Sequence, residues 1–79
     1  MTYSKKPFEG YTHRYKVEFE VYNQDHTSNI DLYTDESDRD KVHEYLVEKV
    51  NRRNVLSFAI VHVATKEEDE MVTEFLKDL

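Results

Sequence analysis

Residues 11–21 read Tyr-Thr-His-Arg-Tyr-Lys-Val-Glu-Phe-Glu-Val, and this stretch decides the fold of the 79-residue chain. Its odd positions carry Tyr, His, Tyr, Val, Phe and Val, whereas its even positions carry Thr, Arg, Lys, Glu and Glu. Side chains of a β-strand point alternately to its two faces, so a period of two residues separates a buried face from a solvent-facing one. The stretch therefore predicts a strand with one buried face.

A hairpin partner is predicted directly after this strand. Residues 23–28 read Asn-Gln-Asp-His-Thr-Ser, and such side chains favour turns because they hydrogen-bond to nearby backbone groups. A shorter return strand is then indicated by the apolar residues Ile30, Leu32 and Tyr33. We expect these two strands to be antiparallel.

The next segment has the pattern of an amphipathic helix. Asp35 or Ser37 can cap its first backbone N–H groups, and Asn54 is a plausible stop. Apolar residues then recur at the spacing of one helix face, at Val42, Tyr45, Leu46 and Val50.

A third strand and a second helix follow. Residues 55–65 are rich in β-branched side chains and are apolar at both odd and even positions, which predicts a strand that needs cover on both faces. The sequence Thr65-Lys-Glu-Glu68 matches a capping box and opens a closing helix. Its apolar stripe is formed by Met71, Val72, Phe75, Leu76 and Leu79.

The predicted fold class is therefore α+β with the order ββαβα. A right-handed crossover places the third strand beside the first, which gives a three-stranded antiparallel sheet of order 2-1-3 with both helices on one face. One apolar face of the third strand would then be bare, and a homodimer through that strand would cover it. The predicted interface comprises Val55, Ala59, Val61 and Val63. Alternatively, the closing helix or the N-terminal arm wraps back over this face.

Length and composition limit the class of protein. Gly10 and Pro7 are the only residues of their types, so we expect an extended arm at residues 1–10 and a single compact domain at residues 11–79. The chain has no cysteine and no apolar run near the ~20 residues of a membrane span. A cytoplasmic protein is the expectation. The sequence pI of about 5.1 argues against direct nucleic-acid binding, which needs cations to neutralise phosphates.

No motif predicts catalysis, a cofactor or a metal site. Asp40, His43 and Glu44 would share a helix face, but the four histidines form no tight ligand pattern. Residues 35–46 differ from a calcium loop, because Asp40 stands where a glycine should turn the chain and Leu46 where a glutamate should bind. Without a cysteine or a G-x-S-x-G turn, we expect a protein that is not an enzyme.

Acidic residues are concentrated between Glu18 and Glu48, where ten carboxylates face two cations. Four of them recur every fourth residue, at Glu36, Asp40, Glu44 and Glu48, and would form one stripe on a helix. An ordinary solvated helix face explains much of this stripe. It does not explain the segregation of charge, because residues 49–66 carry four cations and no carboxylate.

In its small size, its lack of cysteine, its many tyrosines and its helix-borne carboxylates, the chain resembles the DNA-mimic host-takeover proteins of phages, and among them the inhibitors of the nucleoid protein HU. The resemblance implies a noncatalytic homodimer in the host cytoplasm whose carboxylates stand in for phosphates on a basic partner. The partner-binding residues it implies are Glu18, Glu20, Glu36, Asp40, Glu44, Glu48, Glu67, Glu68 and Glu70. A departure is the set of cations that a pure mimic would not need, such as Lys5, Lys49 and Arg52.

Two functions are therefore expected from the sequence. The first is inhibition of a basic DNA-binding protein by phosphate mimicry, without direct binding to nucleic acid or membrane. The alternative is a small adaptor or regulator that binds another kind of protein through an exposed strand or an apolar face.

Overall fold

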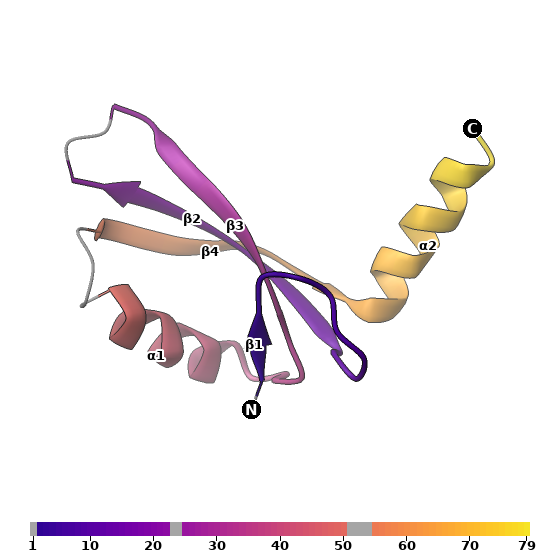
Figure 1. Ribbon diagram of the computed structural model, residues 1–79, viewed down its shortest axis with the longest axis horizontal. Helices are drawn as coiled ribbons and strands as arrows, with labels where there is room; N and C mark the ends of the chain where they lie inside the picture. The colour runs from indigo at the N-terminus through magenta and orange to yellow at the C-terminus, as the bar shows by residue number, and fades with distance from the viewer. Residues whose placement is uncertain (1, 23–24, 51–54) are drawn as a thin grey trace.

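The computed structural model describes residues 2–22, 25–50 and 55–79, and Figure 1 shows their arrangement. The predicted helix stop at Asn54 and the start of the predicted turn, Asn23 and Gln24, lie outside the described residues. The elements follow in the order β1 (Tyr3–Ser4), β2 (His13–Val21), β3 (Thr27–Thr34), α1 (Arg39–Val50), β4 (Val55–Thr65) and α2 (Lys66–Lys77). The predicted α+β class is confirmed.

The sheet has the strand order β1-β3-β2-β4, and every neighbouring pair is antiparallel. The hairpin β2–β3 and the position of β4 beside β2 agree with the predicted order of the three main strands. The prediction of only three strands is wrong. Tyr3 and Ser4, inside the predicted N-terminal arm, pair with Thr34 and Tyr33 and add a fourth strand.

Strand β1 is held by contacts beyond its two paired residues. The Tyr3 ring stacks on the Tyr45 ring of α1 with centroids 3.9 Å apart and planes 7° apart. The backbone N–H of Thr2 donates to Asp35 Oδ1 at 3.2 Å. A strand of two residues shows no alternation in the sequence, so its position depends on these distant partners and could not be read locally.

Helix α1 covers one face of the sheet. Its residues Val42 and Leu46 are buried, and Tyr45 and Val50 are half-buried, so the predicted stripe is confirmed. The guanidinium of Arg39 donates to the backbone carbonyl of Ile60 at 2.9 Å, which ties the start of α1 to β4. The core between helix and sheet comprises Tyr15, Val17, Leu32, Val42, Leu46 and Ile60.

Helix α1 begins at Arg39, a few residues later than expected. The side chain of Asp38 accepts a hydrogen bond from the backbone N–H of Asp40 at 2.9 Å, so Asp38 caps the helix in place of Asp35 or Ser37. The side chains of Asp35, Ser37 and Asp38 all suit this role, which is why the sequence left the start of the helix open.

Strand β4 contains two register shifts against β2. Lys16 lies opposite His62 while Val17 lies opposite Ile60, so Val61 is an extra residue without a partner. Leu56 is extra in the same way near the other end of the strand. These are β-bulges, and each interrupts the alternation of side chains between the two faces of the sheet.

The predicted dimer interface therefore does not lie on one face of β4. Val63 lies opposite Tyr15 and shares the core face, whereas Ala59 lies opposite Glu18 and shares the outer face. Val61 occupies a bulge. Val55 lies opposite Val21 and keeps the core face with Val63. Alternation wrongly placed Ala59 and Val61 with these two residues, because each bulge adds a residue that the period of two does not count.

Helix α2 starts as predicted but does not pack as predicted. The Thr65 hydroxyl oxygen accepts from the Glu68 backbone N–H at 3.2 Å, which confirms Thr65 as the N-cap. The Glu68 carboxylate accepts from the Thr65 hydroxyl at 3.2 Å, whereas in a full capping box it would accept from the Thr65 backbone N–H. None of the residues of α2 is buried, and Figure 1 shows the helix extending away from the sheet, at the opposite end of the molecule from α1. The prediction that both helices cover one face is wrong.

Candidate protein-docking surface

The apolar side of α2 is the most exposed apolar surface of the described residues. Phe75 and Leu76 are 64% and 60% exposed, and Met71 is 69% exposed. With Val72 and Leu79 they repeat at intervals of three and four residues, so they share one side of the helix. Burying one such side chain in a partner contributes about 1.5–3 kcal/mol. Covering the stripe with a partner would therefore be favourable.

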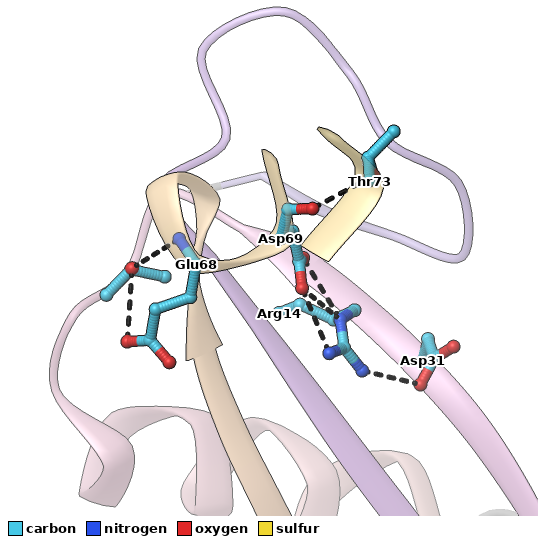
Figure 2. A network of polar contacts seen from close by, with 6 residues as sticks. Arg14, Asp31, Glu68, Asp69 and Thr73 are labelled. Carbon is cyan, nitrogen blue, oxygen red and sulfur yellow. Dashed lines mark hydrogen bonds and ion pairs between the residues drawn. The ribbon is translucent and has the colours of Figure 1, made fainter. Parts of the chain in front are cut away.

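An ion pair anchors the first turn of α2 to the sheet. Arg14 Nη2 of β2 donates to Asp69 Oδ1 of α2 at 3.0 Å, and Arg14 Nε donates to Asp69 Oδ2 at 3.1 Å. Figure 2 shows Arg14 between Asp69 and Asp31, with Thr73 hydrogen-bonded to the Asp69 backbone one turn further on. The hydrogen bond to Asp69 raises the pKa of Arg14 above its ordinary value. This contact joins the first turn of α2 to the sheet face opposite α1, because Arg14 alternates with the buried Tyr15.

A second anchor lies beside this ion pair. The backbone N–H of Lys66 donates to the carbonyl of Thr12 at 2.8 Å, and the Lys66 ammonium lies 5.4 Å from the centre of the Tyr11 ring. Burial raises the pKa of Tyr11, and the charge of Asp69 raises it further. The base of α2 is therefore positioned, whereas its apolar side projects into solvent.

Strand β4 adds apolar surface next to the start of α2. Val61 and Val63 are 50% and 37% exposed and lie in the half of β4 that leads to α2. Among the described residues β4 pairs only with β2, so its second edge carries no strand. Arg39 at the start of α1 contacts the Ile60 carbonyl, so the residues of β4 that follow Ile60 extend past the end of α1 that begins at Arg39.

An apolar groove lies on the other side of the molecule, between α1 and the sheet. Its volume is about 490 Å³, and Lys5 and Lys49 are the charged residues among those lining it. The stacked rings of Tyr3 and Tyr45 belong to its wall, and the Lys49 ammonium lies 5.4 Å from the Tyr45 ring centre. Burial raises the pKa of Tyr3, and the negative charge of Glu36 adds to this effect. No sequence pattern predicted the groove, because it depends on how α1 and β1 meet the sheet.

The acidic stripe predicted on α1 is shorter than expected. Glu36 precedes the helix and is only 4% exposed. Its Oε2 accepts from the Asp38 backbone N–H at 3.1 Å, and its Oε1 is buried without a hydrogen-bond partner among the described residues. Glu36 therefore cannot present its carboxylate to a partner in this structure. Its spacing matched the stripe, but its place before the helix turns it inward.

The remaining predicted partner-binding carboxylates lie on three separate surfaces. Asp40, Glu44 and Glu48 are exposed on α1. Glu18 and Glu20 lie on the sheet face opposite α1, because they alternate with the core residues of β2. The predicted carboxylates of α2, which are Glu67, Glu68 and Glu70, are exposed on that helix. The structure does not bring these three sets together.

No metal-binding cluster of three side chains occurs within residues 2–22, 25–50 and 55–79, and Asp40, His43 and Glu44 do not form one. In the same part of the chain, none of the helices is long and apolar enough to cross a membrane. No family model, curated protein or solved structure matches the chain.

Proposed function

We propose that this chain is a noncatalytic interaction protein that binds another protein through the apolar side of α2. The observation that supports the proposal is a two-sided helix with an apolar stripe of which no residue is buried. Amphipathic helices commonly bind by laying such a stripe into an apolar groove, with anchors three and four residues apart. Met71, Phe75 and Leu79 have this spacing, as do Val72 and Leu76.

The position of α2 supports the same function. Arg14 and Asp69 hold its first turn to the sheet, and Thr65 caps it, so the helix is formed before a partner arrives. Preorganisation reduces the entropy lost on binding. The polar side carries acids such as Glu70 and Glu74, which favours a partner with basic residues around its groove.

Capture from a bacterial lysate to which a differently tagged copy of the chain has been added tests this proposal. The double variant F75E/L76E introduces charge into the apolar stripe, whereas K77E makes the same change in net charge on the opposite side of α2. We expect the partner to be captured by the parent chain and by K77E at both low and high salt, and to be lost with F75E/L76E. Equal capture by both variants would overturn the proposal.

The exposed acids of α1 favour a second candidate, an inhibitor that mimics DNA phosphates on a basic DNA-binding protein such as an HU-like nucleoid protein. Asp40, Glu44 and Glu48 are all exposed and lie about 6 Å apart along the helix at ~1.5 Å per residue. Duplex DNA has one charge per ~1.7 Å of its axis, so this stripe alone is sparser than DNA. Binding of this kind weakens steeply as salt rises, whereas apolar docking does not.

A further inference from the structure

We infer that the partner of α2 is a second copy of this chain, and that each copy lays its α2 into the groove between α1 and the sheet of the other. This inference rests on the proposed role of α2 as a docking helix and names its occupant. It makes the groove and the helix the two halves of one interface.

The groove needs an apolar cover. Phe19, Ile30 and Phe58 pack at the margin of the core, remain partly exposed and line the groove. The stripe of α2 supplies side chains of the same kind, led by Phe75 and Leu76. Both surfaces are left open by the described chain, and each is the type of surface that the other requires.

The charges of the two surfaces are opposite. α2 carries five carboxylates, at Glu67, Glu68, Asp69, Glu70 and Glu74, and two lysines. The charged residues lining the groove are both cations, Lys5 and Lys49. An acidic helix over a lysine-flanked groove is favoured in orientation and in rate of encounter. A basic or neutral helix would not have this advantage.

A chain cannot fill its own groove with its own α2. The groove extends along β4 to Val55, ten residues from Thr65, which is about 33 Å of strand at ~3.3 Å per residue. The twelve residues of α2 span only about 18 Å at ~1.5 Å per residue. Folding back would also break the Arg14–Asp69 contact on the opposite face of the sheet. A copy of α2 that fills the groove must therefore come from another molecule.

Sedimentation equilibrium tests the assembly at micromolar to submillimolar concentrations. We expect the parent chain and K77E to reach twice 9.5 kDa, and F75E/L76E to remain at 9.5 kDa. Because α2 buries no residue within its own chain, F75E/L76E should keep the parent's circular dichroism, and its melting temperature at dilutions where the parent is monomeric, so a lost dimer would not reflect unfolding. A parent chain that stays at 9.5 kDa, or an F75E/L76E dimer, would overturn the inference.

Disulfide trapping tests the interface itself, since the chain contains no cysteine. L76C places a thiol on the stripe, V55C places one in the groove, and S57C places one on the outer face of β4 opposite Glu20. We expect mild oxidation of mixed chains to join L76C to V55C and to leave L76C with S57C largely unlinked. Equal linking of both pairs would contradict groove docking.

The two proposals fail in different ways. A parent chain that stays monomeric but captures a lysate protein only with Phe75 and Leu76 intact would overturn the exchange of helices and leave the docking function standing. A parent chain whose mass and whose capture are both unchanged by F75E/L76E would overturn both.

Discussion

Arg14 of β2 and Asp69 of α2 form a forked ion pair whose closest nitrogen and oxygen atoms are 3.0 Å apart. Both side chains are about one-fifth exposed, at 21% and 22%, so the pair is partly shielded from water. It joins a helix without buried residues to the outer face of the sheet. The orientation of the apolar stripe of α2 therefore depends on a contact that the stripe itself does not make.

Replacing Asp69 tests this contact. D69N keeps the size of the side chain and removes its charge, and we expect the free energy of unfolding to fall by about 1 kcal/mol, as for a forked and partly buried pair. D31N is the control, because Asp31 is more exposed and lies 3.5 Å from Arg14. Urea unfolding measures both. An equal loss in the two variants would show that the fork at Asp69 has no special role.

Two valines of α1 give a matched test of the core. Val42 is fully buried and Val47 is 37% exposed on the same helix. V42A removes two buried carbon atoms and leaves a cavity, so we expect a loss of about 2–3 kcal/mol in the free energy of unfolding. V47A should change it by less than about 0.5 kcal/mol, because exposed substitutions have small effects. Similar losses would mean that α1 does not pack with Val42 inward.

Tyr15 makes the stability sensitive to alkaline pH. Burial raises its pKa above the ordinary value of 10.0, and the negative charge of Glu36 adds to this effect. Above that pH the unfolded chain loses the Tyr15 proton while the folded chain keeps it. The folded state then binds more protons, so the free energy of unfolding falls as pH rises past 10.0.

The variant Y15F separates two roles of this hydroxyl. The Tyr15 hydroxyl donates to the Glu36 carbonyl at 2.9 Å, so its removal should cost about 1 kcal/mol at neutral pH. The same variant should show a shallower loss of stability in alkali, measured by urea unfolding at a series of pH values. Y22F, at an exposed tyrosine, is the control at neutral pH. An unchanged alkaline slope in Y15F would exclude Tyr15 as its source.

Charge reversal on α1 tests phosphate mimicry. E44K/E48K should abolish displacement of duplex DNA from an HU-type protein at low salt, if the exposed acids of α1 act as phosphates. E9K/D25K changes the net charge equally at exposed positions away from that helix and should compete like the parent. Fluorescence anisotropy of labelled DNA measures both. Equal competition by the parent and both variants would show that the acids of α1 are only an ordinary solvated helix face.

The elements with strong local signals were predictable from the sequence. The alternation in residues 13–21 gave β2, the spacing of Val42 and Leu46 gave the buried side of α1, and the reciprocal Thr65 and Glu68 gave the start of α2. In each case the pattern and its cause lie within a few residues of each other. The order of the three main strands followed from connection rules.

The remaining features depend on contacts between distant segments. β1 forms because Tyr3 stacks on Tyr45 and pairs with the end of β3. The same two tyrosines form part of the wall of the groove, so the groove depends on these contacts as well. The bulges at Leu56 and Val61 left no signal, since a run that is apolar at both odd and even positions hides an extra residue. The apolar stripe of α2 was predicted, but it was expected to pack on the chain's own sheet. Periodicity shows that one side of a helix is apolar, but it does not show against which surface that side packs.

The two bulges of β4 also affect the tendency of the chain to aggregate through strand pairing. An outer strand with bare backbone groups is a template for strands of other molecules, and repeated addition leads to amyloid-like fibrils. A bulge bends and twists the strand and leaves one residue out of register. At Leu56 and Val61 such a ladder would be interrupted within a single strand length. β4 thus resists open-ended polymerisation even though it is long, apolar and at the margin of the sheet.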